Sequence, residues 1–189
     1  MELQFSLDSG KLIIKKDGEV VDTKHSLLSF IRWTERETPL NKKELRNMEE
    51  ISGIKIPEFY LQFIQLTGGD NPEVVDHPGE TVCFSSATVM GGRFEQHPIM
   101  DGIEDIQDHS TAFVAEFAYE YNNEDDSDHA LTARTLKLLP LYSSNGSAMC
   151  LDFSESATDP KVVYADTEET DVFPAADNFL DFLLHLEII

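Results

Sequence analysis

Basic residues are scarce in the last two thirds of this sequence. Residues 67–189 contain 4 Lys or Arg against 25 Asp or Glu, whereas residues 1–66 contain 10 against 11. Between Phe94 and Ala133 there are 11 acidic residues and no basic one. A field of that sign repels nucleic acid and anionic lipid and attracts basic proteins. We therefore expect a basic protein partner, with acidity that serves only solubility as the alternative.

Cysteines and long apolar runs are also few. Cys83 and Cys150 fall far below a disulfide framework, and we expect reduced thiols. No run approaches the roughly 18 apolar residues of a membrane helix, and Met1-Glu2-Leu3-Gln4 does not resemble a signal peptide. Since 41% of the residues are hydrophobic, the chain has enough apolar side chains for a core. These features predict a folded cytoplasmic protein.

Motifs that carry chemistry are missing as well. The sequence has no Gly-x-Ser-x-Gly, no Gly-x-x-x-x-Gly-Lys, no His-Glu-x-x-His and no Cys-x-x-Cys. Asp105, Asp108 and His109 could form a carboxylate–histidine set on one helix turn. The acidic run that ends at His129 could bind a hard cation such as Ca²⁺ through Asp125, Asp126 and Asp128. Neither group has the spacing of a known loop, and a solvated acidic surface is the simpler interpretation. We therefore predict no catalytic residues, no metal and no cofactor.

Residues 1–24 have the pattern of a small β-meander. Leu3, Phe5 and Leu7 alternate with polar residues, and turns are predicted at Asp8-Ser9-Gly10 and at Asp17-Gly18. A helix is then predicted from Ser26, with Leu27, Leu28, Phe30, Ile31 and Trp33 as apolar positions and Pro39 at its end.

Further helices are predicted from capping and spacing signals. Asn41 begins one that Gly53 ends, and Pro57 occupies the first position of the next, which Gly68-Gly69 ends. In this second helix Tyr60, Phe63, Ile64 and Thr67 share a face. Residues 103–121 fit either a helix or a strand, and we favour the helix because its apolar arc continues over four turns.

The last third is predicted to be rich in strands. Short strands are expected at Thr81–Phe84 and Thr88–Met90, and longer ones at Leu136–Tyr142, Ala148–Phe153 and Val162–Tyr164. A turn is expected at residues 143–146. Asp177 or Asn178 begins a closing helix with Phe179, Phe182, Leu183 and Leu186 inward.

Four blocks of this sequence, in order, resemble the SUKH superfamily. The first is the run from Met48 to Gly69, with Gly53-Ile54-Lys55-Ile56-Pro57 between two helices and a closing Gly-Gly. The second joins Leu138-Leu139-Pro140-Leu141 to Asn145-Gly146 and Met149-Cys150-Leu151-Asp152. Val162-Val163-Tyr164 and the closing helix from Ala176 to Leu183 complete the pattern. Residues 1–24 lie outside it, and residues 91–134 do not align.

The resemblance implies an α+β fold. We expect a single domain with a central, mainly antiparallel sheet flanked by helices and an N-terminal β-meander. In this division residues 1–24 form a meander that decorates the core, and residues 25–189 form the SUKH-like domain.

The resemblance also implies a class of function. Most bacterial members resemble immunity proteins, which bind and neutralise a toxin domain, often a nuclease, and eukaryotic relatives include the yeast Smi and Knr regulators, which are interaction hubs. The family supplies no catalytic residues. Acidic residues of the central segment, with one aromatic, are the expected contacts with a basic toxin domain: Asp101, Glu104, Asp105, Asp108, Glu116, Tyr119, Glu120, Glu124, Asp125, Asp126 and Asp128. A regulatory or scaffolding module is the first alternative, and an undetected enzyme or cation-binding protein is the second.

Overall fold

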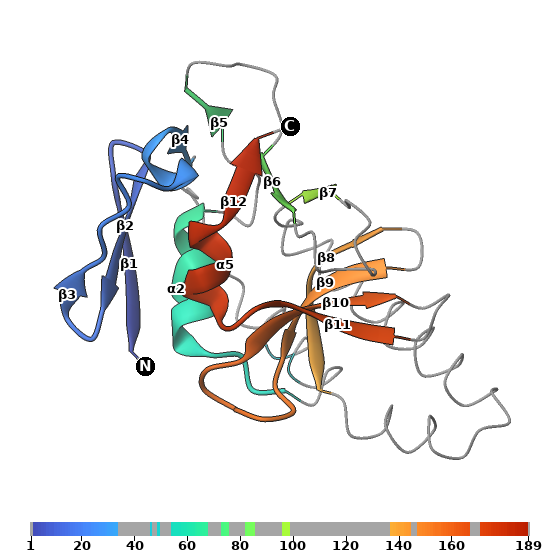
Figure 1. Ribbon diagram of the computed structural model, residues 1–189. Helices are drawn as coiled ribbons and strands as arrows, with labels where there is room; N and C mark the ends of the chain where they lie inside the picture. The colour runs from blue at the N-terminus through green and yellow to red at the C-terminus, as the bar shows by residue number, and fades with distance from the viewer. Residues whose placement is uncertain are drawn as a thin grey trace, which may run out of the picture.

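The computed structural model describes residues 2–33, 46, 49, 54–67, 73–75, 82–85, 96–98, 137–144, 147–166 and 171–188. Two helices, α2 (Glu58–Thr67) and α5 (Phe179–Leu184), lie side by side in the middle of the molecule. A three-stranded meander covers one side of the pair, and a four-stranded antiparallel sheet lies on the other (Figure 1). This arrangement confirms the predicted α+β class.

The meander follows the sequence prediction closely. It consists of β1 (Leu3–Asp8), β2 (Lys11–Lys16) and β3 (Glu19–Val20), paired in that order. Both connections are two-residue turns in which each residue has a positive φ: 52° and 78° at Ser9 and Gly10, and 51° and 87° at Asp17 and Gly18. Turns of this hand match the twist of the flanking strands, which is why a residue pair ending in Gly is favoured there.

One face of the meander belongs to the main core. Leu3, Phe5, Leu12 and Ile14 are buried there together with residues of both helices. The backbone N–H of Phe5 donates to the side-chain oxygen of Gln62 on α2 at 2.9 Å. The alternation in β1 thus places its apolar side chains on α2, and α2 also accepts a hydrogen bond from that strand.

The segment after the meander is not the helix that its spacing predicts. Leu27–Ser29 forms a single 3₁₀ turn, and Ile31–Arg32 is a short strand, β4, that pairs with β5 (Glu73–Val74). The hydroxyl of Ser26 donates back to Thr23 instead of capping a helix. Long-range backbone pairing determines this path, because the N–H of Trp33 donates to the carbonyl of Gly10 at 2.8 Å. Leu28, Ile31 and Trp33 are buried as expected. The backbone that places them is a 3₁₀ turn followed by a short strand, and not the predicted helix.

Helix α2 agrees with its prediction within one residue. The carbonyl of Pro57 accepts the first helical hydrogen bonds, from Tyr60 and Leu61, so Pro57 immediately precedes the helix. Tyr60, Phe63, Ile64 and Thr67 are all buried. The Thr67 hydroxyl satisfies its hydrogen-bonding need by donating to the Phe63 carbonyl at 2.9 Å.

The four-stranded sheet is buried on both faces. It comprises β8 (Leu138–Ser144), β9 (Ser147–Asp152), β10 (Lys161–Asp166) and β11 (Asp171–Ala176), in the order β11-β10-β9-β8. One face packs against the helices; its buried residues are Leu139, Leu141, Met149, Leu151, Val162 and Tyr164. The other face forms a second cluster of Leu138, Ala148, Cys150, Val163 and Ala165. Strands covered on both sides carry continuous apolar runs, as Val162 to Ala165 does.

Five strands were not expected from the sequence: β4, β5, β7, β11 and β12. Strand β11 contains Pro174, which is tolerated because β11 is at the sheet edge and the register shifts beside it. Strands β6 (Val82–Ser85), β7 (Gln96–Pro98) and β12 (Leu186–Ile188) form a separate sheet in the order β12-β6-β7, and of these only β6 was predicted. Leu186 is therefore buried in a strand, since α5 ends at Leu184.

Phe179 joins the layers at the centre of the core. Its ring lies 5.1 Å from that of Phe63, 5.7 Å from Tyr60 and 6.3 Å from Phe5, all in edge-to-face arrangements. Edge-to-face pairs place the positive rim of one ring on the negative face of another. The meander and α2 therefore both pack against the side chain of Phe179 on α5.

Several sequence predictions lie outside the described residues. They are the strand at Thr88–Met90, the helix or strand at 103–121 and the acidic loop at 122–129. Of the helix predicted from Asn41, Arg46 and Glu49 are described, and both are helical.

Candidate functional site

The predicted contact residues, from Asp101 to Asp128, all lie in the part of the chain that the structure does not describe. Their role stays a prediction. The described residues provide two other features that suit a partner, and the two share a loop.

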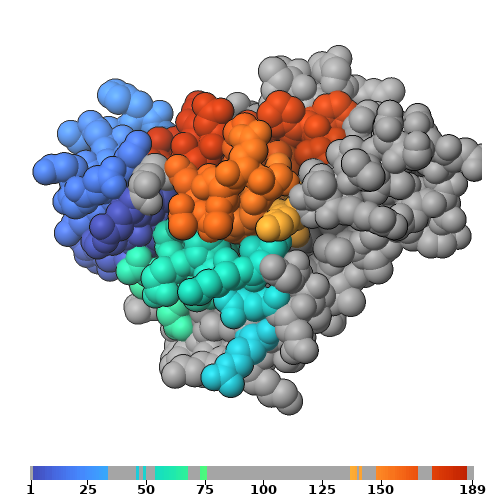
Figure 2. Space-filling model, turned by 90° about the horizontal axis from the view of Figure 1, so that it is seen from below, coloured from blue at the N-terminus to red at the C-terminus, as the bar shows by residue number. Residues whose placement is uncertain are grey.

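The first feature is a groove of about 560 Å³ on the face shown in Figure 2. We call it the linker groove, because one wall is the Ile54–Pro57 link into α2. The other walls are the start of β1 and the loop after β9. Apolar residues form most of the lining: Leu3, Ile54, Ile56, Pro57, Phe59, Leu61, Phe153 and Ala157. The remainder is polar: Glu2, Glu49, Lys55, Glu58, Lys137 and Thr158.

Hydrogen bonds hold each wall of the linker groove. The Ile56 N–H donates to the carboxylate of Glu49 at 3.2 Å, which fixes the link to the preceding helical segment. The Phe153 N–H donates to the Lys137 carbonyl at 2.8 Å, which ties the loop to the segment before β8. The Glu2 N–H donates to Asp17 at 2.9 Å and positions the start of β1. The groove is therefore largely preformed, as ligand sites usually are.

The second feature is a group of carboxylates around Lys161 at the end of the four-stranded sheet. Lys161 and Glu155 form an ion pair at 2.7 Å between two exposed side chains. The hydrogen bond and charge of Glu155, followed by the charges of Asp152 and Asp177, raise the pKa of Lys161. We call these four residues the Lys161 cluster. It contains three carboxylates and one cation, so its net charge is negative.

The loop between β9 and β10 joins the two features. Phe153, Ala157 and Thr158 of this loop line the linker groove, whereas Asp152 and Glu155 belong to the Lys161 cluster. Two Asx or Ser turns shape the loop: the Ser154 N–H donates to Asp152 at 2.8 Å, and the Asp159 N–H donates to the Ser156 hydroxyl at 3.0 Å. A partner in the groove would therefore lie beside these carboxylates.

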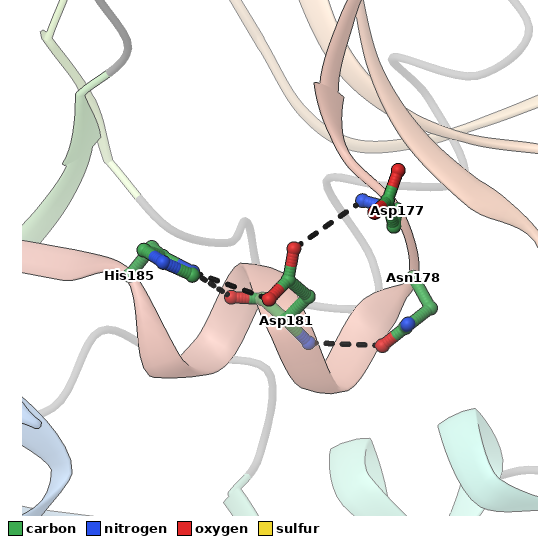
Figure 3. Close-up of polar contacts among 4 residues, drawn as sticks. All are labelled: Asp177, Asn178, Asp181 and His185. Carbon is green, nitrogen blue, oxygen red and sulfur yellow. Dashed lines mark hydrogen bonds and ion pairs between the residues drawn. The ribbon is translucent and has the colours of Figure 1, made fainter.

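The start of α5 shows how neighbouring carboxylates serve the fold (Figure 3). The side-chain oxygen of Asn178 accepts the Asp181 N–H at 2.9 Å, so of the two predicted starts, Asp177 and Asn178, it is Asn178 that caps the helix. The Asp181 carboxylate in turn accepts the Asp177 N–H at 3.5 Å and lies 3.4 Å from Nδ1 of His185. Asp181 is thus engaged in helix capping, and Asp177 belongs to the Lys161 cluster.

Two chemical features of the described residues bear on catalysis. No three His, Cys, Asp or Glu side chains within it are grouped closely enough to hold a metal ion. Burial, followed by the charge of Asp152, raises the pKa of the Cys150 thiol, which keeps that thiol protonated and unreactive. What the arrangement provides is an apolar recess with charged edges, which suits binding.

The linker groove was missed at the sequence level because its walls are far apart in the chain. The Ile54–Pro57 link was identified only as a connection between helices, and Phe153 only as the end of a strand. A usable signal was the alternation of buried Ile54, exposed Lys55 and buried Ile56 immediately before a helix.

These features define an α+β domain, and comparison with known proteins identifies its family. The family model described as SMI1 / KNR4 family (SUKH-1) matches residues 39–185, which is most of the chain. The chain belongs to this family. No curated protein and no solved structure matches it. The meander, at residues 3–20, precedes the matched region.

Family membership is consistent with an immunity-type protein and suggests a protein partner. None of the helices in the described ranges is long and apolar enough to cross a membrane.

Proposed function

We propose that this chain is an immunity protein that binds a cognate secreted toxin domain in the cytoplasm and neutralises it without catalysis. The family match over residues 39–185 is the observation that carries the proposal. The charge distribution supports it, because the acidic excess of residues 67–189 lies mainly in the matched region. A nuclease toxin holds phosphates with a basic surface, and dense carboxylates would bind and occlude such a surface.

The contact surface that we propose includes Asp101, Glu104, Asp105, Asp108 and Glu116, with Tyr119 as an aromatic contact among the charges. An aromatic residue within a charged surface is typical of an interface centre. Glu120, Glu124, Asp125, Asp126 and Asp128 extend this surface. No cofactor or metal is needed for this activity.

Co-expression with the toxin domain encoded by the neighbouring gene tests the function. Cells that carry the wild-type chain are expected to survive, and the two purified proteins are expected to co-elute. The double variant Glu104→Lys and Asp105→Lys is expected to slow association and to reduce survival. The matched control is Asp8→Lys with Glu19→Lys, which changes the net charge equally on the exposed meander.

Each result has a defined meaning. Survival lost with the first pair and kept with the control supports the acidic contact surface. Equal survival with both pairs would move the contact elsewhere, and death with the wild-type chain would overturn the immunity function in favour of a regulatory module. Association of oppositely charged surfaces should slow steeply as salt rises, and an on-rate that salt does not change would contradict electrostatic recognition.

A further inference from the structure

We propose that the linker groove takes an extended, basic segment of the partner protein and encloses one of its large apolar side chains. This rests on the proposed function for one point only, which is that the partner is a protein. The groove lies outside residues 101–128 and is therefore a contact in addition to the acidic surface proposed above.

The shape and lining of the groove select an apolar side chain. Its volume of about 560 Å³ is within the range of about 300–1,000 Å³ typical of ligand sites. Ile54, Ile56, Phe59 and Phe153 are each at most 9% exposed, so they form a fixed apolar floor. An aromatic or long aliphatic side chain would bury its own apolar surface on this floor and lose little entropy in a preformed site.

The charges around the groove select a basic segment. The lining contains Glu2, Glu49 and Glu58 against Lys55 and Lys137. The shared loop adds Asp152 and Asp159, while its Glu155 is paired with Lys161 and these two charges cancel. Among the described residues of the lining and the loop, which form the rim, five carboxylates therefore remain against two lysines. A segment with Lys or Arg on both sides of its apolar residue complements this rim.

Two other surfaces are weaker candidates. Phe30 and Val75 are 56% and 50% exposed and adjacent, since the Val75 N–H donates to the Phe30 carbonyl, but no charge or recess selects an occupant for them. A hollow of about 380 Å³ on the meander is smaller and lined by Lys11 and Lys24 with Asp22, so it lacks an acidic excess. The linker groove is favoured because shape and charge select the same ligand.

Three synthetic peptides test the proposal on the full chain without a toxin. The first has a central Trp with two Lys on each side, the second replaces Trp by Ser, and the third replaces every Lys by Glu. Amide shifts in a ¹⁵N-labelled protein locate binding. The Lys–Trp peptide is expected to shift residues 54–59 and 153–158 and to bind about tenfold more tightly than the Ser peptide, as one buried aromatic ring would give. The Glu–Trp peptide is expected to leave these residues unshifted.

Two matched variants assign the binding to the groove. Ala157→Trp fills the groove from an exposed loop position, and Ser6→Trp adds the same bulk to the exposed face of the meander. Ala157→Trp is expected to abolish the difference between the Trp and Ser peptides, and Ser6→Trp is expected to preserve it. Lys137→Glu is expected to tighten binding of the Lys–Trp peptide about threefold by removing a like charge.

The outcomes separate this inference from the proposed function. Equal binding of the Trp and Ser peptides, shifts confined to other residues, or a difference that persists in Ala157→Trp would each overturn the groove proposal. Neutralisation of a toxin by Ala157→Trp at wild-type strength would also overturn it, while the immunity function would stand. Peptide binding in the groove without neutralisation of any toxin would support the groove and contradict the immunity function.

Discussion

The two β layers that enclose the helices differ in how they are buried and charged. The meander buries one face, and residues 2–24 carry four lysines against five carboxylates. The four-stranded sheet buries both faces, and residues 137–188 carry two lysines against ten carboxylates. The meander precedes the family match and the sheet lies within it. The comparison teaches that core packing extends across the family boundary, whereas the acidic charge is concentrated inside it.

Truncating two neighbouring residues in each layer is expected to give the largest changes in the free energy of unfolding. Phe5→Ala and Tyr164→Ala are each expected to lower the free energy of unfolding by about 3–5 kcal/mol, because each removes a buried ring. Val163→Ala, on the second face of the sheet, is expected to cost about 1–2 kcal/mol, and Ser6→Ala, on the exposed face of the meander, less than about 0.5 kcal/mol. Urea unfolding measures all four.

Two outcomes of this experiment would contradict the difference between the two β layers. If Val163→Ala were as silent as Ser6→Ala, the sheet would be packed on one face only. If Phe5→Ala were silent, the meander would not be part of the core.

The two turns of the meander provide a smaller, matched pair. Gly18→Ala is expected to destabilise by about 1 kcal/mol, since its φ of 87° disfavours any side chain and nothing lies within 4 Å of the added methyl. Gly10→Ala is expected to cost about 2 kcal/mol, because its methyl would also approach the Trp33 carbonyl to 3.1 Å. Equal midpoints in urea for the two variants would show that the Gly10–Trp33 contact carries no constraint.

Cys150 on the second face of the sheet predicts a dependence on pH. Its pKa is raised in the folded chain above the ordinary 9.0, first by burial and then by Asp152. The folded form therefore keeps its proton while the unfolded form loses it, and stability falls as pH rises above about 9. Between pH 8 and 10 the wild type is expected to lose about 1 kcal/mol more than Cys150→Ala. The free energy of unfolding of both proteins is measured by urea unfolding across this pH range. If it fell equally with pH in the two proteins, the thiol would be accessible to solvent.

The helix cap beside the sheet has a similarly small expected effect. Asn178→Ala is expected to destabilise by about 1 kcal/mol because the Asp181 N–H loses its acceptor. Asn178→Ser, which retains a capping oxygen, is expected to retain most of the stability. Thermal unfolding compares the two, and an equal loss in both would assign the effect to something other than the cap.

Local signals in the sequence were sufficient for part of this fold. Gly10 and Gly18 marked the meander turns, and Asn178 marked the start of α5, because each acts through bonds within a few residues. The alternation of Leu3 and Phe5 correctly indicated a half-buried strand.

Long-range pairing explains the errors. The spacing of Leu28 and Ile31 predicts a helix, but Ile31 pairs with Val74 and Trp33 bonds to Gly10. Leu186 continues the helical spacing of α5, yet it pairs with Phe84 in β6. The linker groove has the same origin, since its walls come from residues 2–3, 49–61, 137 and 153–158. A pattern of neighbouring residues cannot indicate contacts between segments so far apart in the sequence.

The pairing of β12 with β6 also has a consequence for the order of folding. These strands are separated by about a hundred residues, whereas β1 and β2 are joined by a two-residue turn and β9 begins three residues after the end of β8. Closing so long a loop is slow compared with forming a hairpin. We expect hydrogen exchange during refolding to protect the hairpins first and the β12–β6 pairing last. Until that last step β12 and the edge of β6 that it pairs with are unpaired, so this is the stage at which the chain is most exposed to aggregation.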